Sequence, residues 1–243
     1  MRMYGVTIDD IYHLEGAIQA IKALNKRVTA RVVIDNVDDI LGTYLEPVKR
    51  LATVCDVMVQ IQDSYGEADM TDEQFQNKAA LLFDHFKCAS IFEVGNEVNG
   101  DWCSKSIAER VDWAYRRSPK PTALTLFYQP GMIDWYRAHP FKTDYVFLSC
   151  YFDNLDAYRN MKLYPCAPEI MEINPKAKIG IGEYGFENMP RAKELHKRLV
   201  ISGVETAEVL AEEWVGGGFY WDFQRDMVPT KKPLFKTLKD SWK

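Results

Sequence analysis

One pattern constrains this chain more than any other: a short run of β-branched and apolar residues, then a longer stretch with helical spacing, recurs along its length. Short apolar runs between turn residues predict strands that are buried on both faces, as in a parallel sheet. Eight such strands are predicted, at residues 4–8, 28–35, 56–62, 90–95, 122–128, 144–151, 178–183 and 217–222.

Helices are predicted in most gaps between these strands, because parallel neighbours require a crossover connection. The clearest covers residues 71–87, where Thr71 and Gln74 form a capping-box pattern and apolar residues recur on one face. The others are predicted at residues 10–24, 37–52, 105–116, 130–138, 157–173, 204–214 and 232–242. The three glycines at residues 216–218 are interpreted as a tight turn before the last strand.

Two architectures arrange alternating strands and helices: an open doubly wound sheet and a closed barrel. The open sheet is disfavoured because residues 8–11, which follow the first strand, lack the glycine-rich turn that binds phosphate. The length of 243 residues is close to the roughly 250 of a closed barrel, and a hydrophobic content of 47% can fill one core. We therefore predict an α/β fold, a (β/α)8 TIM barrel that forms a single domain over residues 1–243.

The charge and hydropathy of the chain argue against two classes of partner. The net charge is −5, and acidic and basic residues are interleaved, so no basic surface for nucleic acid is expected. No run of 18 apolar residues occurs, and no membrane partner is expected. The first ten residues lack the features of a secretory signal, which fits a cytoplasmic chain or a secreted one whose signal has been removed. We expect a monomer.

Polar and aromatic side chains gather where the predicted strands end, which is where active sites of α/β barrels lie. These residues are Asp9, Asp35, Asn36, Gln62, Asp63, Asn96, Glu97, Tyr128, Gln129, Tyr151, Glu183, Trp221 and Asp222. The four histidines fall on predicted helices or loops without metal-ligand spacing, so neither a metal nor another cofactor is expected. A serine nucleophile is also not expected, because the sequence has no GxSxG motif.

Two glutamates end otherwise apolar strands. Glu97 closes the fourth strand and Glu183 closes the seventh. A carboxylate in such a place loses solvation unless it is paired, and its pKa commonly shifts. Strands four and seven lie across the barrel mouth from one another, and two carboxyls about 5 Å apart suit a double displacement at a glycosidic bond with retention.

The residues around these glutamates carry a family resemblance. Residues 95–97, Gly-Asn-Glu, and residues 182–185, Gly-Glu-Tyr-Gly, resemble the corresponding strand ends of clan A glycoside hydrolases, the cellulase-, mannanase- and β-glycosidase-like barrels. The resemblance implies that Glu97 is the acid/base and Glu183 is the nucleophile.

Further roles follow from the same resemblance. It implies that Asn96 contacts the sugar 2-hydroxyl, that Tyr151 donates to the nucleophile, and that Trp221 forms the platform for the sugar next to the cleaved bond. An arginine on strand two is frequent in the clan, and Arg31 lies in that strand. The chain departs from the cellulase-like members that carry histidine two residues before the tyrosine, because that position is Ser149.

Other residues near the strand ends are weaker candidates. Trp102 and Tyr128 could extend the aromatic platform for a pyranose ring, as could Tyr65 and Phe152. Glu93 has the same strand parity as Glu97 and could lie in a buried polar layer. Five polar residues are expected to cap helices and not to bind sugar hydroxyls: Asp9, Asp35, Asn36, Gln62 and Asp63.

These features together predict a retaining glycoside hydrolase that acts on a β-linked oligo- or polysaccharide. One alternative is a TIM barrel that binds carbohydrate without cleaving it. A second alternative is a barrel lyase or isomerase that uses one glutamate as base, with a metal or lysine that the strand ends do not supply.

Overall fold

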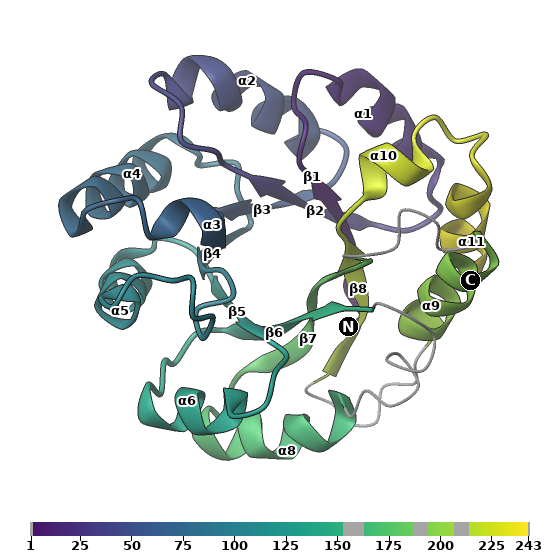
Figure 1. The fold of residues 1–243 in the computed structure, drawn as a ribbon. Helices are drawn as coiled ribbons and strands as arrows, with labels where there is room; N and C mark the ends of the chain where they lie inside the picture. The colour runs from purple at the N-terminus through teal and green to yellow at the C-terminus, as the bar shows by residue number, and fades with distance from the viewer. Residues whose placement is uncertain (1, 153–162, 187–193, 207–213, 243) are drawn as a thin grey trace.

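A computed structural model describes residues 2–152, 163–186, 194–206 and 214–242. Eight parallel strands pair with their neighbours in chain order, and β8 pairs with β1 to close a barrel (Figure 1). The strands are β1 (Tyr4–Ile8), β2 (Val28–Val33), β3 (Asp56–Gln60), β4 (Ile91–Gly95), β5 (Thr122–Phe127), β6 (Tyr145–Tyr151), β7 (Lys178–Gly185) and β8 (Trp214–Tyr220). The predicted (β/α)8 fold is confirmed.

Helices form a ring around the strands (Figure 1). The longer ones are α1 (Leu14–Ala23), α2 (Ile40–Ala52), α4 (Asp72–His85), α5 (Ile107–Arg117), α6 (Met132–Ala138), α8 (Leu163–Ile173), α9 (Glu194–Thr206) and α11 (Pro233–Ser241). Two short helices, α3 (Ser64–Glu67) and α10 (Phe223–Met227), lie inside that ring, close to the barrel mouth. In the described residues, no helix is both long and apolar enough to cross a membrane.

Most predicted elements are observed with shifts of a few residues at their ends. The capping box at Thr71 is present, with hydrogen bonds in both directions between Thr71 and Gln74. The predicted helix at 157–173 is observed from Leu163, and its earlier residues lie outside the described part of the chain.

Two predictions near the C-terminus meet the structure differently. The helix predicted at 204–214 overlaps the end of α9 at residues 204–206, Trp214 begins β8, and residues 207–213 lie outside the described part of the chain. The turn predicted at the glycines 216–218 is wrong, because these residues belong to β8. A Cβ at Gly218 would lie 2.8 Å from the Tyr184 ring, so the strand passes too close to β7 there for a larger residue.

The barrel interior is layered because side chains alternate between the two faces of each strand. A cluster made only of strand residues, Met58, Ile91, Ala123, Phe147 and Phe219, forms the apolar layer. Polar side chains lie two residues further along the same strands and include Glu93, Thr125 and Ser149. The polar side chains therefore lie closer to the carboxyl ends of the strands, where the mouth opens.

A buried carboxylate ties α9 to the C-terminal helix. Glu205 is fully buried and accepts hydrogen bonds from the Tyr184 hydroxyl at 2.7 Å and from Trp242 Nε1 at 2.6 Å. Burial raises the pKa of Glu205 to about 7, although both hydrogen bonds oppose the shift.

This carboxylate should make stability depend on pH. Between pH 4.5 and about 7 the folded protein keeps a proton on Glu205 that the unfolded chain releases, so its contribution to the free energy of unfolding falls as pH rises through this window. The expected loss is about 3 kcal/mol, and Glu205→Gln should remove it. Urea unfolding of both proteins at pH 5 and pH 8 measures the difference. An equal pH dependence in the two proteins would contradict the prediction.

Candidate active site

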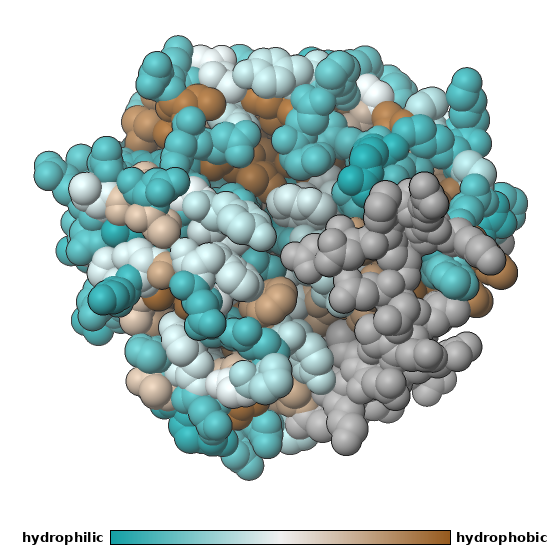
Figure 2. Space-filling view, viewed as in Figure 1, coloured by the Kyte–Doolittle hydropathy of each residue, from teal (hydrophilic) through white to brown (hydrophobic). Residues whose placement is uncertain are grey.

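A cavity of about 450 Å³ opens at the carboxyl ends of the strands. Its lining residues are Asp63, Ser64, Tyr65, Glu97, Trp102, Phe127, Tyr151, Glu183, Phe186, Trp221, Asp222 and Arg225. Both predicted catalytic glutamates are among them. In the view of Figure 2, weakly polar residues lie around the centre of this face and hydrophilic residues dominate its edge.

Irregularities in β4 and β7 shape the strand ends that carry the two glutamates. The register between β4 and β5 shifts between Glu93 and Gly95, and the register between β6 and β7 shifts so that Ser149 pairs with Glu183. Bulges of this kind re-aim side chains next to active sites. Gly182 permits the shift in β7, because a Cβ there would lie 2.6 Å from Phe147 Cβ.

The backbone of Glu97 adopts an uncommon conformation. Its φ is 48°, in the left-handed region, which is costly for a residue with a side chain and is concentrated at functional sites. The turn is held by Val98 N–H donating to Thr125 O at 3.2 Å and Gly100 N–H donating to Glu97 O at 2.8 Å. The strand therefore ends in a turn that directs Glu97 into the cavity.

Glu183 is buried and has one donor on each carboxylate oxygen. Arg31 Nη1 donates to Oε2 at 2.6 Å, and the Tyr151 hydroxyl donates to Oε1. Burial raises the pKa of Tyr151, and the adjacent Glu183 charge raises it further, so the hydroxyl keeps its proton. These contacts hold the Glu183 side chain in a single orientation.

Arg31 forms the centre of the buried polar layer. It is fully buried, and Nε and Nη2 donate to the two oxygens of Glu93 at 2.6 and 3.0 Å. Nη2 also donates to Asn96 Oδ1 at 2.9 Å. Thr125 donates to Glu93 from the neighbouring strand. One guanidinium thus links β2 to the strand ends that carry both catalytic candidates.

Among the residues that the structure describes, hydroxyls and no cation hydrogen-bond the Glu97 carboxyl. The Ser149 hydroxyl donates to Oε1 at 2.5 Å, and the Ser64 hydroxyl donates to Oε2 at 3.1 Å. The two glutamates therefore face the same cavity from opposite kinds of environment, with an ion pair at Glu183 and neutral donors at Glu97.

Burial dominates the proton affinity of both carboxyls. It raises the pKa of Glu183 to about 7 against the lowering effect of Arg31, and it raises the pKa of Glu97 against the two serine hydroxyls. Each carboxylate also disfavours ionisation of the other, so the pair titrates in two coupled steps. The Arg31 contact favours the charged form of Glu183, and the hydroxyls of Ser149 and Ser64 favour the charged form of Glu97.

Aromatic residues predicted to bind sugar line two parts of the cavity. Trp221 follows β8, and its ring lies 5.8 Å from the Arg31 guanidinium carbon. Trp102 stacks on Tyr65 with ring centroids 6.3 Å apart and meets the edge of Phe127 at 5.0 Å. Tyr65 is 72% exposed, so this group can offer a flat apolar face to a ligand.

Three of the predicted candidates are placed away from the cavity wall. Asn96 is buried, is not among the lining residues, and accepts a hydrogen bond from Arg31. Tyr128 lines a separate cavity with Arg137, because neighbouring side chains on a strand point to opposite sides and Phe127 takes the inward position. Phe152 is buried in the hydrophobic core.

Four lining residues were not singled out from the sequence: Ser64, Phe127, Phe186 and Arg225. Ser64 opens the four-residue helix α3, too short to show a helical period. Arg225 lies in α10, which was also not predicted, and pairs with Asp222 at 2.5 Å. Asp222 was noted in the sequence at the end of the last strand. Its ion pair with Arg225 could not be predicted, because it depends on the short helix α10.

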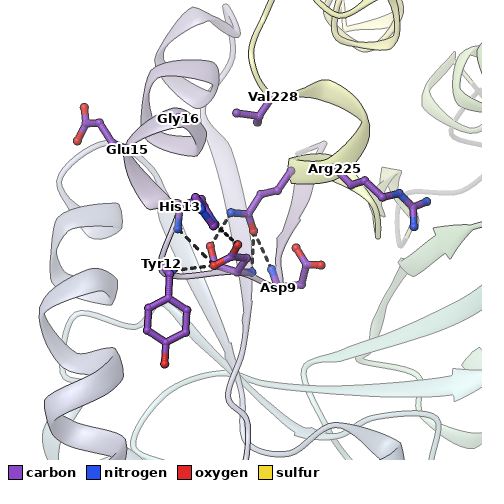
Figure 3. A pocket seen from close by; sticks show the side chains of 9 residues that line it. Asp9, Tyr12, His13, Glu15, Gly16, Arg225 and Val228 are labelled. Atoms are coloured by element: carbon purple, nitrogen blue, oxygen red, sulfur yellow. Dashed lines mark hydrogen bonds and ion pairs between the residues drawn. The ribbon is translucent and has the colours of Figure 1, made fainter.

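Another cavity, of about 670 Å³, shares Arg225 with the cavity that holds the two glutamates (Figure 3). Gln224 Oε1 accepts the backbone N–H groups of Asp9 and Asp10 at 3.0 and 2.9 Å, and the Asp10 carboxylate accepts those of Tyr12 and His13. These bonds stabilise the loop after β1.

The polar residues after β2 and β3 surround a buried lysine. Lys78 Nζ donates to Ile34 O, Asn36 Oδ1 and Gln62 Oε1 at 2.8, 3.1 and 2.6 Å. Burial lowers the pKa of Lys78 to about 7. Lys78 is therefore engaged in fixing these two loops. No group of three His, Cys, Asp or Glu side chains that could hold a metal occurs in the described parts of the chain.

Comparison with known proteins is informative at the level of fold. No family model matches the sequence, and no curated protein matches it significantly. A GH128 (subgroup I) endo-β-1,3-glucanase from Amycolatopsis mediterranei, solved with laminaritriose, superposes with a TM-score of 0.58 at 12% identity, over 100% of this chain and 98% of that one.

Two other solved structures have the same barrel. A Faecalibacterium prausnitzii β-glucuronidase superposes with a TM-score of 0.62 at 14% identity, and this chain covers 49% of its length. A candidate deoxyribose-phosphate aldolase from Toxoplasma gondii ME49 gives a TM-score of 0.51 at 12% identity, over 99% of this chain and 94% of that one. The resemblance to clan A-like glycoside hydrolase barrels is therefore confirmed for the fold, and the aldolase shows that this fold alone does not decide the reaction.

Proposed function

We propose that this protein is a retaining glycoside hydrolase that cleaves β-linked glycans or glycosides, with Glu183 as nucleophile and Glu97 as acid/base. The observation that carries the proposal is the difference between the two carboxyls in one cavity. Glu183 is paired with Arg31 and bonded by Tyr151, whereas the described partners of the Glu97 carboxyl are two serine hydroxyls. Two carboxyls whose environments push their pKa values apart can take different roles, one as the ionised group and the other as the proton donor.

In the first step, a Glu183 carboxylate oxygen attacks the anomeric carbon as the bond to the leaving oxygen breaks. Glu97 transfers its proton to that leaving oxygen, so the aglycone departs as a neutral alcohol and the sugar remains as an ester of Glu183. Arg31 and Tyr151 orient the attacking carboxylate.

In the second step, Glu97 acts as a base. It takes a proton from water as the water oxygen attacks the anomeric carbon, and the ester bond breaks to release Glu183 as a carboxylate. Two inversions at the anomeric carbon give net retention, and Glu97 is again protonated.

The substrate class follows from the walls of the cavity. Trp221 can pack against the sugar next to the cleaved bond, and the group of Trp102, Tyr65 and Phe127 can pack against the neighbouring one. Aromatic faces bind the apolar faces of pyranose rings. Asn96 is assigned a supporting role, through Arg31, and Tyr128 is left out of the site.

Turnover of defined substrates tests the proposal. Wild-type protein is incubated with aryl β-glycosides and with β-glucan, mannan and xylan oligosaccharides, and products are separated by chromatography while binding is measured by calorimetry. Hydrolysis of at least one β-linked substrate is expected. Binding without hydrolysis would favour the non-catalytic barrel, and unsaturated or isomerised products would favour a lyase or isomerase.

The activity should depend on pH as a bell. The reactive form carries one proton, on Glu97, so activity is expected to rise as the pair loses its first proton and to fall as it loses the second. Because burial raises both pKa values, the maximum is expected between the ordinary glutamate value of 4.5 and about 7. The measurement is kcat/KM against pH on the best substrate. A rate that stays constant up to pH 9 would contradict this assignment.

A further inference from the structure

We propose that Ser64 and Ser149, the serine pair, are positioning residues that orient the Glu97 carboxyl and set how readily it exchanges its proton. This inference rests on the proposed function of Glu97 and adds two residues that the family resemblance did not assign. Ser149 stands where some cellulase-like barrels carry histidine, and Ser64 comes from a different strand end.

The serine pair contacts both oxygens of one carboxyl. Ser149 reaches Oε1 at 2.5 Å from β6, and Ser64 reaches Oε2 at 3.1 Å from the start of α3. Both serines are buried, with 0% and 2% of their surface exposed, respectively. A carboxyl held at both oxygens cannot rotate about its last torsion without losing a hydrogen bond, so its orientation toward the leaving oxygen is fixed.

Each serine is itself held in place by its element. Ser149 O accepts Tyr128 N–H at 2.9 Å in the barrel ladder. The short helix of Ser64 is fixed by Arg110, whose Nη1 donates to Glu67 O at 2.8 Å and to Glu67 Oε1 at 2.5 Å. Ser104 N–H donates to Glu67 Oε2 at 2.7 Å. The hydroxyls therefore do not depend on flexible loops for their position.

Hydroxyls suit a group that must be an acid in one step and a base in the next. A serine hydroxyl can donate a hydrogen bond to a carboxylate and can also accept one from a carboxylic acid, whereas a lysine or arginine would only donate and would favour the charged form. One hydroxyl on each oxygen leaves a lone pair on each oxygen for the transferred proton. The same contacts can thus serve both steps.

The serine pair and burial have opposite effects on the pKa of Glu97. Burial raises the pKa of Glu97, and the hydrogen bonds from Ser149 and Ser64 lower it. Removing either hydroxyl should therefore raise the pKa further and delay loss of the proton. The ionisable groups described around Glu97 come from five strands or strand ends: Arg31 from β2, Asp63 after β3, Cys103 after β4, Cys150 and Tyr151 from β6, and Glu183 from β7.

The test compares two substrates that differ in their need for an acid. Wild type, Ser64→Ala, Ser149→Ala and the control Ser241→Ala are assayed on phenyl and 2,4-dinitrophenyl β-glycosides of the sugar that wild type hydrolyses. The control removes a hydroxyl that donates to Thr237 O in α11 and to Ser202 Oγ in α9. The dinitrophenolate departs without protonation. We expect each cavity variant to lose about 10-fold in kcat/KM on the phenyl substrate and little on the other. In the profile of kcat/KM against pH, the alkaline limb of each cavity variant should move up by about one pH unit. The control should have the rates and the pH profile of wild type.

The outcomes separate this inference from the proposed function. Equal losses on both substrates with an unmoved alkaline limb would show a purely structural role and overturn the inference while leaving the hydrolase intact. Wild-type activity on neither glycoside nor any oligosaccharide would overturn both. Far-ultraviolet circular dichroism identifies a variant that has failed to fold, and the two independent serines give two chances to observe the effect.

Discussion

Glu183→Gln is expected to lower kcat by about 10⁴- to 10⁶-fold, the size of effect seen when a group that forms the covalent intermediate is removed. The amide retains the shape of the side chain and can still accept from Arg31 or Tyr151, but it cannot form the glycosyl ester. Glu97→Gln is expected to cost less, about 10²- to 10⁴-fold, because it removes only proton transfer.

Glu183→Gln is expected to lose activity without losing stability. Burial raises the pKa of this carboxyl to about 7, which means that its ionised form destabilises the folded state. The melting temperature of the variant at pH 8 is therefore expected to be no lower than that of wild type. Initial rates measure the activity and thermal melts measure the stability. The matched control is Glu109→Gln, which makes the same change at an exposed residue. Activity of Glu183→Gln within 10-fold of wild type would contradict the nucleophile assignment.

Arg31→Met is expected to destabilise the protein by about 3–5 kcal/mol, the largest stability effect that the described contacts predict. Arg31 is fully buried and is the cation between Glu93 and Glu183. Removing one partner of a buried ion pair leaves an uncompensated charge, which costs more than the pair contributes when intact.

Arg27→Met provides the comparison, because Arg27 also forms a two-bond ion pair but at the surface. Its side chain is 80% exposed and bonds Asp56 at 2.6 Å, and its loss is expected to cost no more than about 1 kcal/mol. Urea unfolding of both variants at pH 8 gives the difference. If Arg31→Met is destabilised no more than Arg27→Met, the buried polar layer does not stabilise the barrel in the way described.

The fold could be predicted because its signal is local and repeated. Each strand is a short apolar run, and eight such runs with intervening helices leave few topologies. The errors occur where local pattern and tertiary packing disagree. α9 runs over Glu194–Thr206, where the local pattern suggested a helix beginning only at residue 204. Three consecutive glycines form part of β8, because β7 passes close to Gly218.

The site was only partly predictable. Glu97 and Glu183 could be proposed because each ends an apolar strand in a recognisable motif. The side chains that bond each glutamate could not be predicted from the sequence. Arg31 and Glu183, for example, are 152 positions apart and meet only when the barrel closes. Ser64 was missed because its helix has four residues and no period.

The central claim, that Glu183 forms a glycosyl intermediate and Glu97 moves the proton, is tested most directly by azide rescue of Glu97→Ala and Glu183→Ala, with the anomeric configuration of the glycosyl azides read by proton NMR. A β-azide is expected from Glu97→Ala, because azide replaces water in the second displacement. An α-azide is expected from Glu183→Ala, because azide replaces the nucleophile in a single displacement. An α-azide from Glu97→Ala, or the same anomer from both variants, would contradict the assigned roles.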